Sequence, residues 1–457
     1  MLTNKNRFLT LVLIFLTGYV GLALQLMVLR QVSHFVGSTT AITSIVIGIY
    51  LGAMTVGYFI GTKKLNININ KTVSFSFLAI AVLTILACSF PLLSYYWGLM
   101  TVDKIHSPII QTFIYSLLFM SVAPLLSGFN TAALSHNMHE SERNNTGIIL
   151  GVGTIGSVLG SLVTTLIFMA LLGVNYTILL TVALAGIGAY IAHRKRWILA
   201  TGIAILAIAW MFNNDGILYK RYRIVSNNDV NTVAVIESLE GRYLLIESAL
   251  HSYISDDGKR AADYIDYINN HFVYSIRGGT PKEILVLGAG GFTLGNLDDH
   301  NNYTFVDIDR ALKNISEKHF LKNKLSDNKR FLVQDAGQFL RTDGIDYDLI
   351  VMDVFSRWTI PESAITLEFM ENMKKRLRPG GIIVINTIAN PMFGDEFSKK
   401  LDNTMRMAFP HNLSRQIVGP YDGWPPDNYA NILYIWNNVP NSGKIYNANK
   451  NFTVYDK

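Results

Sequence analysis

The first 212 residues contain seven apolar segments without a charged side chain, and this feature restricts the fold more than any other. Each segment is about 20 residues long, the length that an α-helix needs to cross about 30 Å of hydrocarbon. Half of the 457 residues are apolar and 16% are charged, a balance typical of a chain that lies partly in a bilayer. We therefore predict a multi-pass α-helical bundle in the cell membrane. The segments are residues 8–29, 41–61, 73–95, 109–126, 148–172, 176–192 and 197–212.

Polar side chains within these segments are few. No Asp, Glu, Lys or Arg lies well inside a segment, although transport pathways through a bundle usually contain such residues. Gln25, Asn130 and Arg30, the last at a segment end, are expected to form hydrogen bonds between helices. The bundle is therefore interpreted as an anchor or scaffold, and the sequence leaves open whether it transports anything.

Basic residues flank the segments unequally. Nine lie in the loops on the N-terminal side of the bundle, whereas the opposite loops offer only Arg30 and Lys104. Cytoplasmic loops carry the excess of Lys and Arg, so the N-terminus is predicted to be cytoplasmic. Segment 197–212 is the shortest, and whether it spans the membrane decides which side holds the C-terminal part.

From residue 214 the charge density is ordinary and the pattern changes. Residues 232–237 and 242–247, separated by Gly241, predict an antiparallel hairpin, followed by a turn at 252–257 and a helix at 261–272. Strands and helices then alternate, which predicts a doubly wound, Rossmann-like α/β domain. The expected strands are 284–289, 303–307, 331–333, 348–352 and 382–387, with helices from 293, at 310–320 and at 365–377, and a turn at 379–381.

These patterns divide the chain into four parts. Residues 1–213 form the predicted multi-pass membrane domain, and 214–280 form the β-hairpin module with its linking helix. Residues 281–440 form the α/β domain, and 441–457 form a loosely ordered tail that is rich in Asn.

The segment 284–297 has the pattern of a buried strand, a glycine turn and the start of a helix. Gly288, Gly290 and Gly291 form the turn, where glycine lets the backbone approach a ligand closely. A tight strand–helix turn is the alternative explanation, but the spacing to the next carboxylate favours a ligand-binding turn. Asp307, 19 residues after Gly288 at the end of the next strand, is placed to accept hydrogen bonds from ribose hydroxyls. Asp309 is expected to cap the following helix.

Two further carboxylates end predicted strands. Asp335, with Ala336, could accept a hydrogen bond from an adenine amino group or cap the next helix. Asp353 could take a proton from an attacking amine or hold its loop through backbone amides. We favour the functional role, because an acid that faces the crevice at a strand end has little packing reason to be there. Together with Asp307, these acids predict a site for an S-adenosyl-type nucleoside.

Other classes of site are disfavoured. Cys88 is the single cysteine, so an internal disulfide and a cysteine zinc site are excluded, and no metal is predicted. Basic residues cluster beside apolar segments, which indicates a lipid bilayer as partner and not a nucleic acid. A homo-oligomer is compatible with the sequence, which does not decide the oligomeric state.

Residues 219–436 resemble the polyamine aminopropyltransferases, the spermidine synthase family. The resemblance rests on the order and spacing of Val286-Leu-Gly-Ala-Gly-Gly, Val306-Asp-Ile-Asp, Gln334-Asp-Ala, Tyr347-Asp-Leu-Ile-Val-Met-Asp and Leu377-Arg-Pro-Gly-Gly. A multi-span region before such a domain is similar to the membrane-bound spermidine synthase-like proteins. Asp353-Val-Phe-Ser356 and Ile360-Pro361 look similar to the D-A-F-S and I-P pattern of that subgroup.

The resemblance implies roles for the three acids. Asp307 and Asp335 would contact ribose and adenine, and Asp353 would deprotonate the attacking amine. Catalysis would consist of positioning and proton removal, since a sulfonium is already an activated leaving group.

The resemblance also marks differences on the amine side of the site. Gly291 and Ser356 stand where the family carries carboxylates. Tyr264-Ile-Asp266 only partly matches the family's Tyr-His-Glu motif. A site that binds a dicationic amine is weakened by the loss of two carboxylates. The nucleoside half of the site is therefore expected to be retained and the amine half altered, with Tyr264, Asp266 and Ser356 as candidate substrate contacts.

The expected function is membrane-anchored aminopropyl transfer from decarboxylated S-adenosylmethionine to a small amine such as putrescine, a step of polyamine biosynthesis. One alternative is an S-adenosylmethionine-dependent methyltransferase or sulfonium-cleaving enzyme, which Gly291 fits because methyl donors bring a whole methionine moiety. Another is a non-catalytic membrane protein whose α/β domain binds a ligand or partner. The acceptor substrate is not specified by the sequence.

Overall fold

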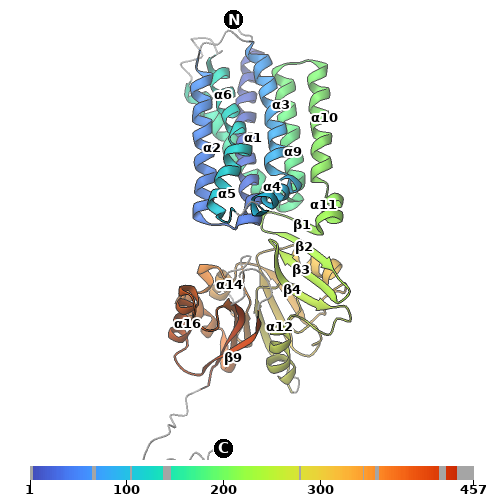
Figure 1. Ribbon diagram of the computed structural model, residues 1–457, viewed down its shortest axis with the longest axis vertical. Helices are drawn as coiled ribbons and strands as arrows, with labels where there is room; N and C mark the ends of the chain where they lie inside the picture. The colour runs from blue at the N-terminus through green and yellow to red at the C-terminus, as the bar shows by residue number, and fades with distance from the viewer. Residues whose placement is uncertain are drawn as a thin grey trace, which may run out of the picture. The chain divides into compact units, whose positions relative to one another are not determined.

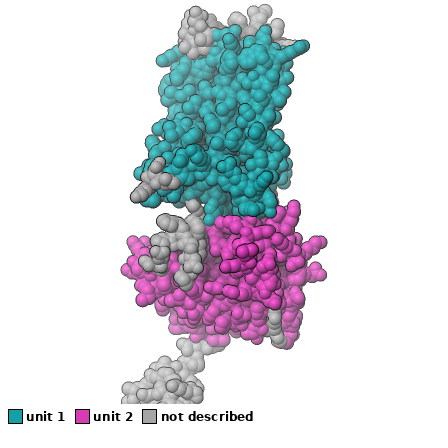
Figure 2. Space-filling model, turned by 45° about the vertical axis from the view of Figure 1, so that its right-hand side comes forward, with its two compact units in different colours: residues 1–234, 246–248 teal, residues 235–245, 249–457 magenta. Residues whose placement is uncertain are grey.

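The computed structural model describes residues 4–63, 68–102, 105–136, 146–276, 279–342, 344–355, 360–420 and 429–439. The chain forms two compact units, coloured separately in Figure 2. The first consists of residues 1–234 with 246–248, and the second of residues 235–245 with 249–457. Residues of the predicted β-hairpin module, 214–280, belong partly to each unit.

The first unit is mainly helical (Figure 1). Helices α1 and α3 are the inner helices, since 67% and 61% of their most apolar stretches are buried, against 22% for α2. Two π-helical turns, Ser116–Met120 and Thr164–Met169, continue α5 and α8. The helices are α1 (Asn4–Val36), α2 (Thr40–Gly61), α3 (Ile69–Cys88), α4 (Phe90–Val102), α5 (Pro108–Tyr115), α6 (Val122–His136), α8 (Thr146–Val163), α9 (Ala170–Ala192), α10 (Arg196–Asn213) and α11 (Asp215–Tyr222).

The seven predicted apolar segments lie largely in helices, but the helices do not correspond to them one to one. Among the described residues, five helices are long and apolar enough to cross a membrane, or six if the bent pair Pro108–Met120 and Val122–Ser135 is one span. The predicted segments 148–172 and 176–192 lie on either side of Gly173, whose φ of +83° breaks the helical run Gly147–Ala192. Residues 127–136, which lie between two predicted segments, belong to α6.

Within the described ranges, two of the three residues predicted to form hydrogen bonds between helices do not do so. Arg30 pairs with Glu247 at 3.2 Å and not with a neighbouring helix. Asn130 is fully buried, and its side chain forms no hydrogen bond with any part of the chain that the structure describes. Gln31 instead links α1 to the end of α3, because its Nε2 donates to the carbonyl of Cys88 at 2.7 Å.

Residues 224–255 form a four-stranded sheet in the order β1-β2-β3-β4. Its strands are β1 (Ile224–Asn227), β2 (Thr232–Glu237), β3 (Gly241–Ile246) and β4 (Ala249–Ser255). The predicted hairpin corresponds to β2 and β3. The turn expected at 252–257 is wrong for residues 252–255, which end β4. The chain turns earlier, where Glu247 and Ser248 have φ values of +50° and +63°, as a two-residue hairpin turn requires.

The second unit contains a seven-stranded sheet in the order β10-β11-β9-β8-β5-β6-β7 (Figure 1). Strands β5 to β9 are parallel, and β11 is antiparallel to both β9 and β10. From β5 the chain builds outward to β6 and β7, then returns to add β8 and β9 on the other side. The strands are β5 (Glu283–Leu287), β6 (Asn302–Asp307), β7 (Lys329–Val333), β8 (Tyr347–Met352), β9 (Leu377–Ala389), β10 (Leu413–Pro420) and β11 (Ala430–Asn437).

The point between β5 and β8 is therefore a topological switch point, where ligands bind in open α/β sheets. Leu285 and Leu287 of β5 face a buried cluster that side chains of α14, α15 and α16 complete. The predicted Rossmann-like fold is confirmed, whereas the antiparallel pair β10–β11 was not predicted. The helices of this unit are α12 (Asp263–Ile268), α13 (Leu312–Ile315), α14 (Ala336–Thr342), α15 (Leu367–Lys375) and α16 (Glu396–Ala408).

Two predicted details of this domain are wrong. No helix follows the glycine turn, because residues 288–301, all described, form only turns and bends. Phe292 and Gly295 have φ values of +60° and +62°, which a right-handed helix does not contain. Residues 379–381 also do not precede a strand. They lie within β9, where Gly380 has a φ of +79° and the register with β8 shifts.

Candidate functional site

The site begins at Gly288, directly after β5 at the switch point. This residue has a φ of +89°, and a Cβ built on it would lie 2.2 Å from the carbonyl oxygen of Asp353. The glycine turn therefore lies directly against the backbone that leaves β8. Only glycine satisfies both the conformation and the close approach.

Asp307, at the end of β6, binds the glycine turn through its side chain. Its Oδ2 accepts from the Ala289 amide at 2.9 Å, and its Oδ1 accepts from the Asp309 amide at 3.0 Å. Burial raises the pKa of Asp307 to about 6, although these amide bonds act in the opposite direction. A carboxylate has about four acceptor positions, so each oxygen can still accept from a ligand hydroxyl. Asp309 holds the turn before α13 through the Ala311 amide.

Asp353 follows β8 and is held by two neutral donors. Its Oδ2 accepts from the Tyr264 hydroxyl of α12 at 2.8 Å, and its Oδ1 accepts from Asn386 Nδ2 of β9 at 2.8 Å. Asn386 is oriented in turn by Asn431 of β11, whose Nδ2 donates to Asn386 Oδ1 at 3.0 Å. Burial raises the pKa of Asp353, and the two hydrogen bonds oppose the rise. The result is an oriented carboxylate with a raised proton affinity, the property expected of a general base.

The structure describes two of the three candidate substrate contacts, Tyr264 and Asp266. Tyr264 touches Asp353, but Asp266 Oδ1 accepts from the Ala261 amide at 2.9 Å near the start of α12. Burial raises the pKa of Asp266. Ser356 lies outside the described residues.

Asp335 adopts the capping arrangement. Its Oδ1 accepts from the Gln338 amide at 2.8 Å, and Ala336 is the first residue of α14. The Asp335 side chain is exposed, so its second oxygen is open to a ligand, and the predicted adenine contact stays a prediction.

Gly291 lies in a space that no side chain can share. Its amide donates to Ser252 Oγ of β4 at 2.9 Å. A Cβ built on Gly291 would lie 2.2 Å from Cε1 of Phe320, whose side chain is fully buried. An acid at this position would therefore collide with an aromatic ring that cannot move into solvent.

Part of the chain matches known proteins. Residues 266–419 match the spermine/spermidine synthase domain. Over these residues the chain is spermidine synthase-like. It is 29% identical to a polyamine aminopropyltransferase of Vibrio vulnificus over 142 residues, which are 30% of this chain and 47% of the relative. It is 33% identical to that of Clostridium beijerinckii over 122 residues, 25% of this chain and 43% of the relative. The match thus spans less than half of each relative.

Solved structures with a similar fold include a probable spermidine synthase from Corynebacterium glutamicum, with a TM-score of 0.39 and 19% identity. That alignment covers 49% of this chain and 81% of the other. Spermidine synthase from Thermotoga maritima has a TM-score of 0.37 and 16% identity, over 47% and 73% of the two chains.

Four residues of the spermidine synthase-like site were not predicted. Asn386 and Asn431 each interrupt an apolar strand with an amide, and this interruption was a usable signal. Ser252 and Phe320 carry no such signal, because only the fold brings them to the glycine turn. Over the residues that the structure describes, no group of three or more His, Cys, Asp or Glu side chains could hold a metal ion.

Proposed function

We propose that the spermidine synthase-like unit transfers an aminopropyl group from decarboxylated S-adenosylmethionine to a small amine. The observation that carries this proposal is the arrangement of Asp353, oriented by Tyr264 and Asn386 beside the glycine turn at the switch point. The match of residues 266–419 to the spermine/spermidine synthase domain supports it.

The nucleoside would lie along the carboxyl ends of β5, β6 and β7. Asp307 has acceptor positions for the ribose hydroxyls, and Asp335 has an exposed oxygen for the adenine amino group. Because Gly288 has no side chain, the nucleoside can approach its backbone closely, which a Cβ would prevent.

Asp353 would accept the proton that the acceptor amine loses. As the amine nitrogen bonds to the carbon next to the sulfonium, the carbon–sulfur bond breaks and its electron pair stays on sulfur, so methylthioadenosine leaves. Tyr264 and Asn386 fix both carboxylate oxygens, which limits the directions from which the amine can approach. The protein's contribution is thus orientation and proton removal.

The donor preference can be measured on the full-length protein in detergent. By isothermal titration calorimetry we expect decarboxylated S-adenosylmethionine and methylthioadenosine to bind more tightly than S-adenosylmethionine. No helix N-terminus follows the glycine turn to stabilise a methionine carboxylate, because residues 288–301 form turns only. Tighter binding of S-adenosylmethionine would favour a methyltransferase. If no adenosyl compound bound, both the aminopropyltransferase and the methyltransferase would be ruled out.

Nucleoside affinity should depend on pH through Asp307. Ribose hydroxyls donate to the ionised carboxylate, and burial places the pKa of Asp307 at about 6. The affinity for methylthioadenosine should therefore be constant above this pH and fall up to about tenfold per pH unit below it. Titration calorimetry from pH 5 to 8 measures this profile. Asp307→Asn should bind more weakly with a flat profile, and an unchanged profile in that variant would exclude Asp307 as the cause.

We further propose that the amine half of the site is altered by Phe320. Gly291→Asp alone should destabilise the protein by about 1–3 kcal/mol, because the new side chain meets the Phe320 ring. Phe320→Leu alone should also destabilise it, since it leaves a small cavity. The double variant should lose less stability than the two single losses together, and it alone should gain affinity for putrescine. Thermal unfolding and calorimetry test both points, and additive losses would show that Phe320 does not exclude the acid.

We also propose that the helical unit anchors the protein as a multi-pass membrane protein. Its apolar helices support this, and the excess of basic residues near the start of α1 supports a cytoplasmic N-terminus. Helix α11 lies at the end of this unit opposite the start of α1 (Figure 1). Three further cations lie at that end, Lys220, Arg221 and Arg223. They reduce the difference in basic residues between the two ends of the helical unit.

A reporter fused after Lys457 tests the side of the membrane. The two proposals differ in what they require of this reporter. Adenosyl donors are made in the cytoplasm, so the transferase requires a cytoplasmic reporter, whereas a cytoplasmic start of α1, with α11 at the opposite end of the unit, requires an external one. An external reporter would overturn the transferase and favour a domain that only binds a ligand or partner.

A further inference from the structure

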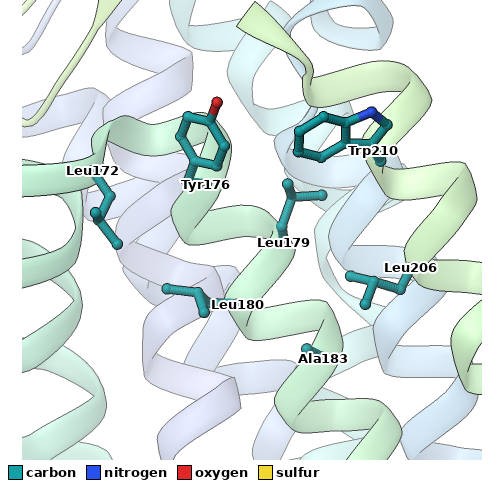
Figure 3. Close-up of a pocket in the computed structure, with 7 residues that line it drawn as sticks. All are labelled: Leu172, Tyr176, Leu179, Leu180, Ala183, Leu206 and Trp210. Carbon is teal, nitrogen blue, oxygen red and sulfur yellow. The ribbon is translucent and has the colours of Figure 1, made fainter.

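An apolar groove on the helical unit lies between α10 and the two parts of α9 on either side of Gly173. It has a volume of about 330 Å³ and is lined by Leu172, Leu179, Leu180, Leu206 and Trp210 among others. Figure 3 shows Leu180, Leu206 and Ala183 along the groove, with Leu172 on a separate helical segment from Tyr176. Its volume is at the lower end of the range of small-molecule sites, and its walls offer almost only hydrocarbon.

The two aromatic residues lie at one end of this groove. The rings of Tyr176 and Trp210 have centroids 6.2 Å apart, and Trp210 is 47% exposed. Figure 3 shows the Tyr176 hydroxyl directed away from the leucines. Rings with an apolar body and a polar tip concentrate at the boundary between hydrocarbon and headgroups. This end of the groove therefore marks the headgroup level if the unit spans a membrane.

Exposed cations follow immediately after this aromatic pair. Asp215 Oδ1 accepts from Asn175 Nδ2 at 2.7 Å, which fixes the start of α11 beside the groove. Lys220 and Arg221 lie in the last turn of α11, about 8 Å further along its axis. Arg223 follows, with its guanidinium 5.9 Å from the Tyr219 ring centroid.

The charged side chains of α11 and its C-cap favour an anionic ligand. Helix α11 and its C-cap carry three exposed cations and one exposed carboxylate, Asp215. A ligand phosphate is therefore attracted to the last turn of α11 and repelled from its start. A hydrocarbon groove, an aromatic boundary and a cationic turn follow one another in the order found along a phospholipid.

We propose that this groove holds an acyl chain of one anionic phospholipid, whose phosphate lies against Lys220, Arg221 and Arg223. The inference rests on the proposed membrane location of the helical unit. A zwitterionic lipid offers the same acyl chains but gains less from the cations, so the site distinguishes lipids by headgroup charge.

The test uses the full-length protein in nanodiscs with equal amounts of phosphatidylglycerol and phosphatidylcholine of identical acyl chains. Native mass spectrometry after mild delipidation counts the retained lipids. We expect one phosphatidylglycerol to be retained in preference to phosphatidylcholine. Lys220→Gln and Arg221→Gln should each reduce this preference about fivefold. The matched control removes two charges between α9 and α10 at the opposite end of these helices, Arg194→Gln with Lys195→Gln, and should keep the preference.

A second pair of variants tests the groove itself. Leu206→Trp fills it and should abolish the retained lipid, whereas Ile208→Trp, exposed elsewhere on α10, should not. If Leu206→Trp fails to fold, Ala183→Leu fills the groove from the α9 wall. Equal retention of both lipids, or equal effects of the groove variant and its control, would overturn the proposal.

Two further outcomes would also overturn it. Dissociation of a dimer by Leu206→Trp would assign the groove to a second copy of this chain. Recovery of the protein outside the membrane fraction would show that the membrane location is wrong before any lipid is measured.

Discussion

Replacing Asp353 by asparagine should lower aminopropyl transfer about 10²–10⁴-fold while leaving nucleoside affinity near that of the parent. Asparagine has the size of aspartate but cannot accept the proton that the amine loses. It also has one acceptor oxygen, so it cannot accept from both Tyr264 and Asn386 as the carboxylate does. Single-turnover assays with decarboxylated S-adenosylmethionine and calorimetry with methylthioadenosine separate the two effects.

Asp348→Asn is the matched control for this variant. Asp348 lies near the start of β8, at the other end of the strand that Asp353 follows. Its Oδ2 accepts from Arg378 at 2.7 Å and from the Glu283 amide at 2.9 Å, so loss of the charge should cost about 1–3 kcal/mol. Turnover should survive in Asp348→Asn. A parent rate in Asp353→Asn would show that Asp353 is not the base.

Gly288→Ala should lower the free energy of unfolding by about 3 kcal/mol or more and abolish nucleoside binding. The residue's φ of +89° is unfavourable for alanine, and the new methyl group would lie 2.2 Å from the carbonyl oxygen of Asp353. Because that oxygen belongs to the backbone that leaves β8, the strain displaces either the glycine turn or Asp353. Thermal unfolding followed by circular dichroism, together with calorimetry, measures both consequences.

Gly258→Ala separates the effect of an unfavourable φ from the effect of the contact with Asp353. Gly258 has a φ of +72°, but a Cβ built on it meets no atom within 4 Å. This variant therefore carries only the backbone strain of about 1–3 kcal/mol. Equal losses in both variants would show that the contact with Asp353 contributes nothing.

The strand pattern of the α/β domain could be predicted because it depends on local composition. The apolar runs at 284–289, 303–307 and 348–352 correspond to β5, β6 and β8. Parallel strands bring their carboxyl ends to one edge, so the strand pattern alone predicts Asp307, Asp335 and Asp353 at that edge. The missing helix after Gly291 could not be predicted, because residues 293–297 look helical and only their turn conformations show otherwise.

The gap predicted between segments 148–172 and 176–192 agrees with the break at Gly173. The 45° bend between Met120 and Val122, inside the predicted segment 109–126, was not predicted. Hydropathy detects apolar length and carries no information on where a helix within an apolar segment bends.

By itself, the sequence determined two features of this protein. Charge-free apolar segments of about 20 residues favour helices, because such runs are longer than strands usually are. Acids after apolar strands must gather at one edge of a parallel sheet. The tertiary structure alone decided that Tyr264 and Asn386, 89 and 33 residues away in the chain, orient Asp353. It also placed Phe320 against Gly291. Such contacts arise from the packing of separate elements, which no local pattern encodes.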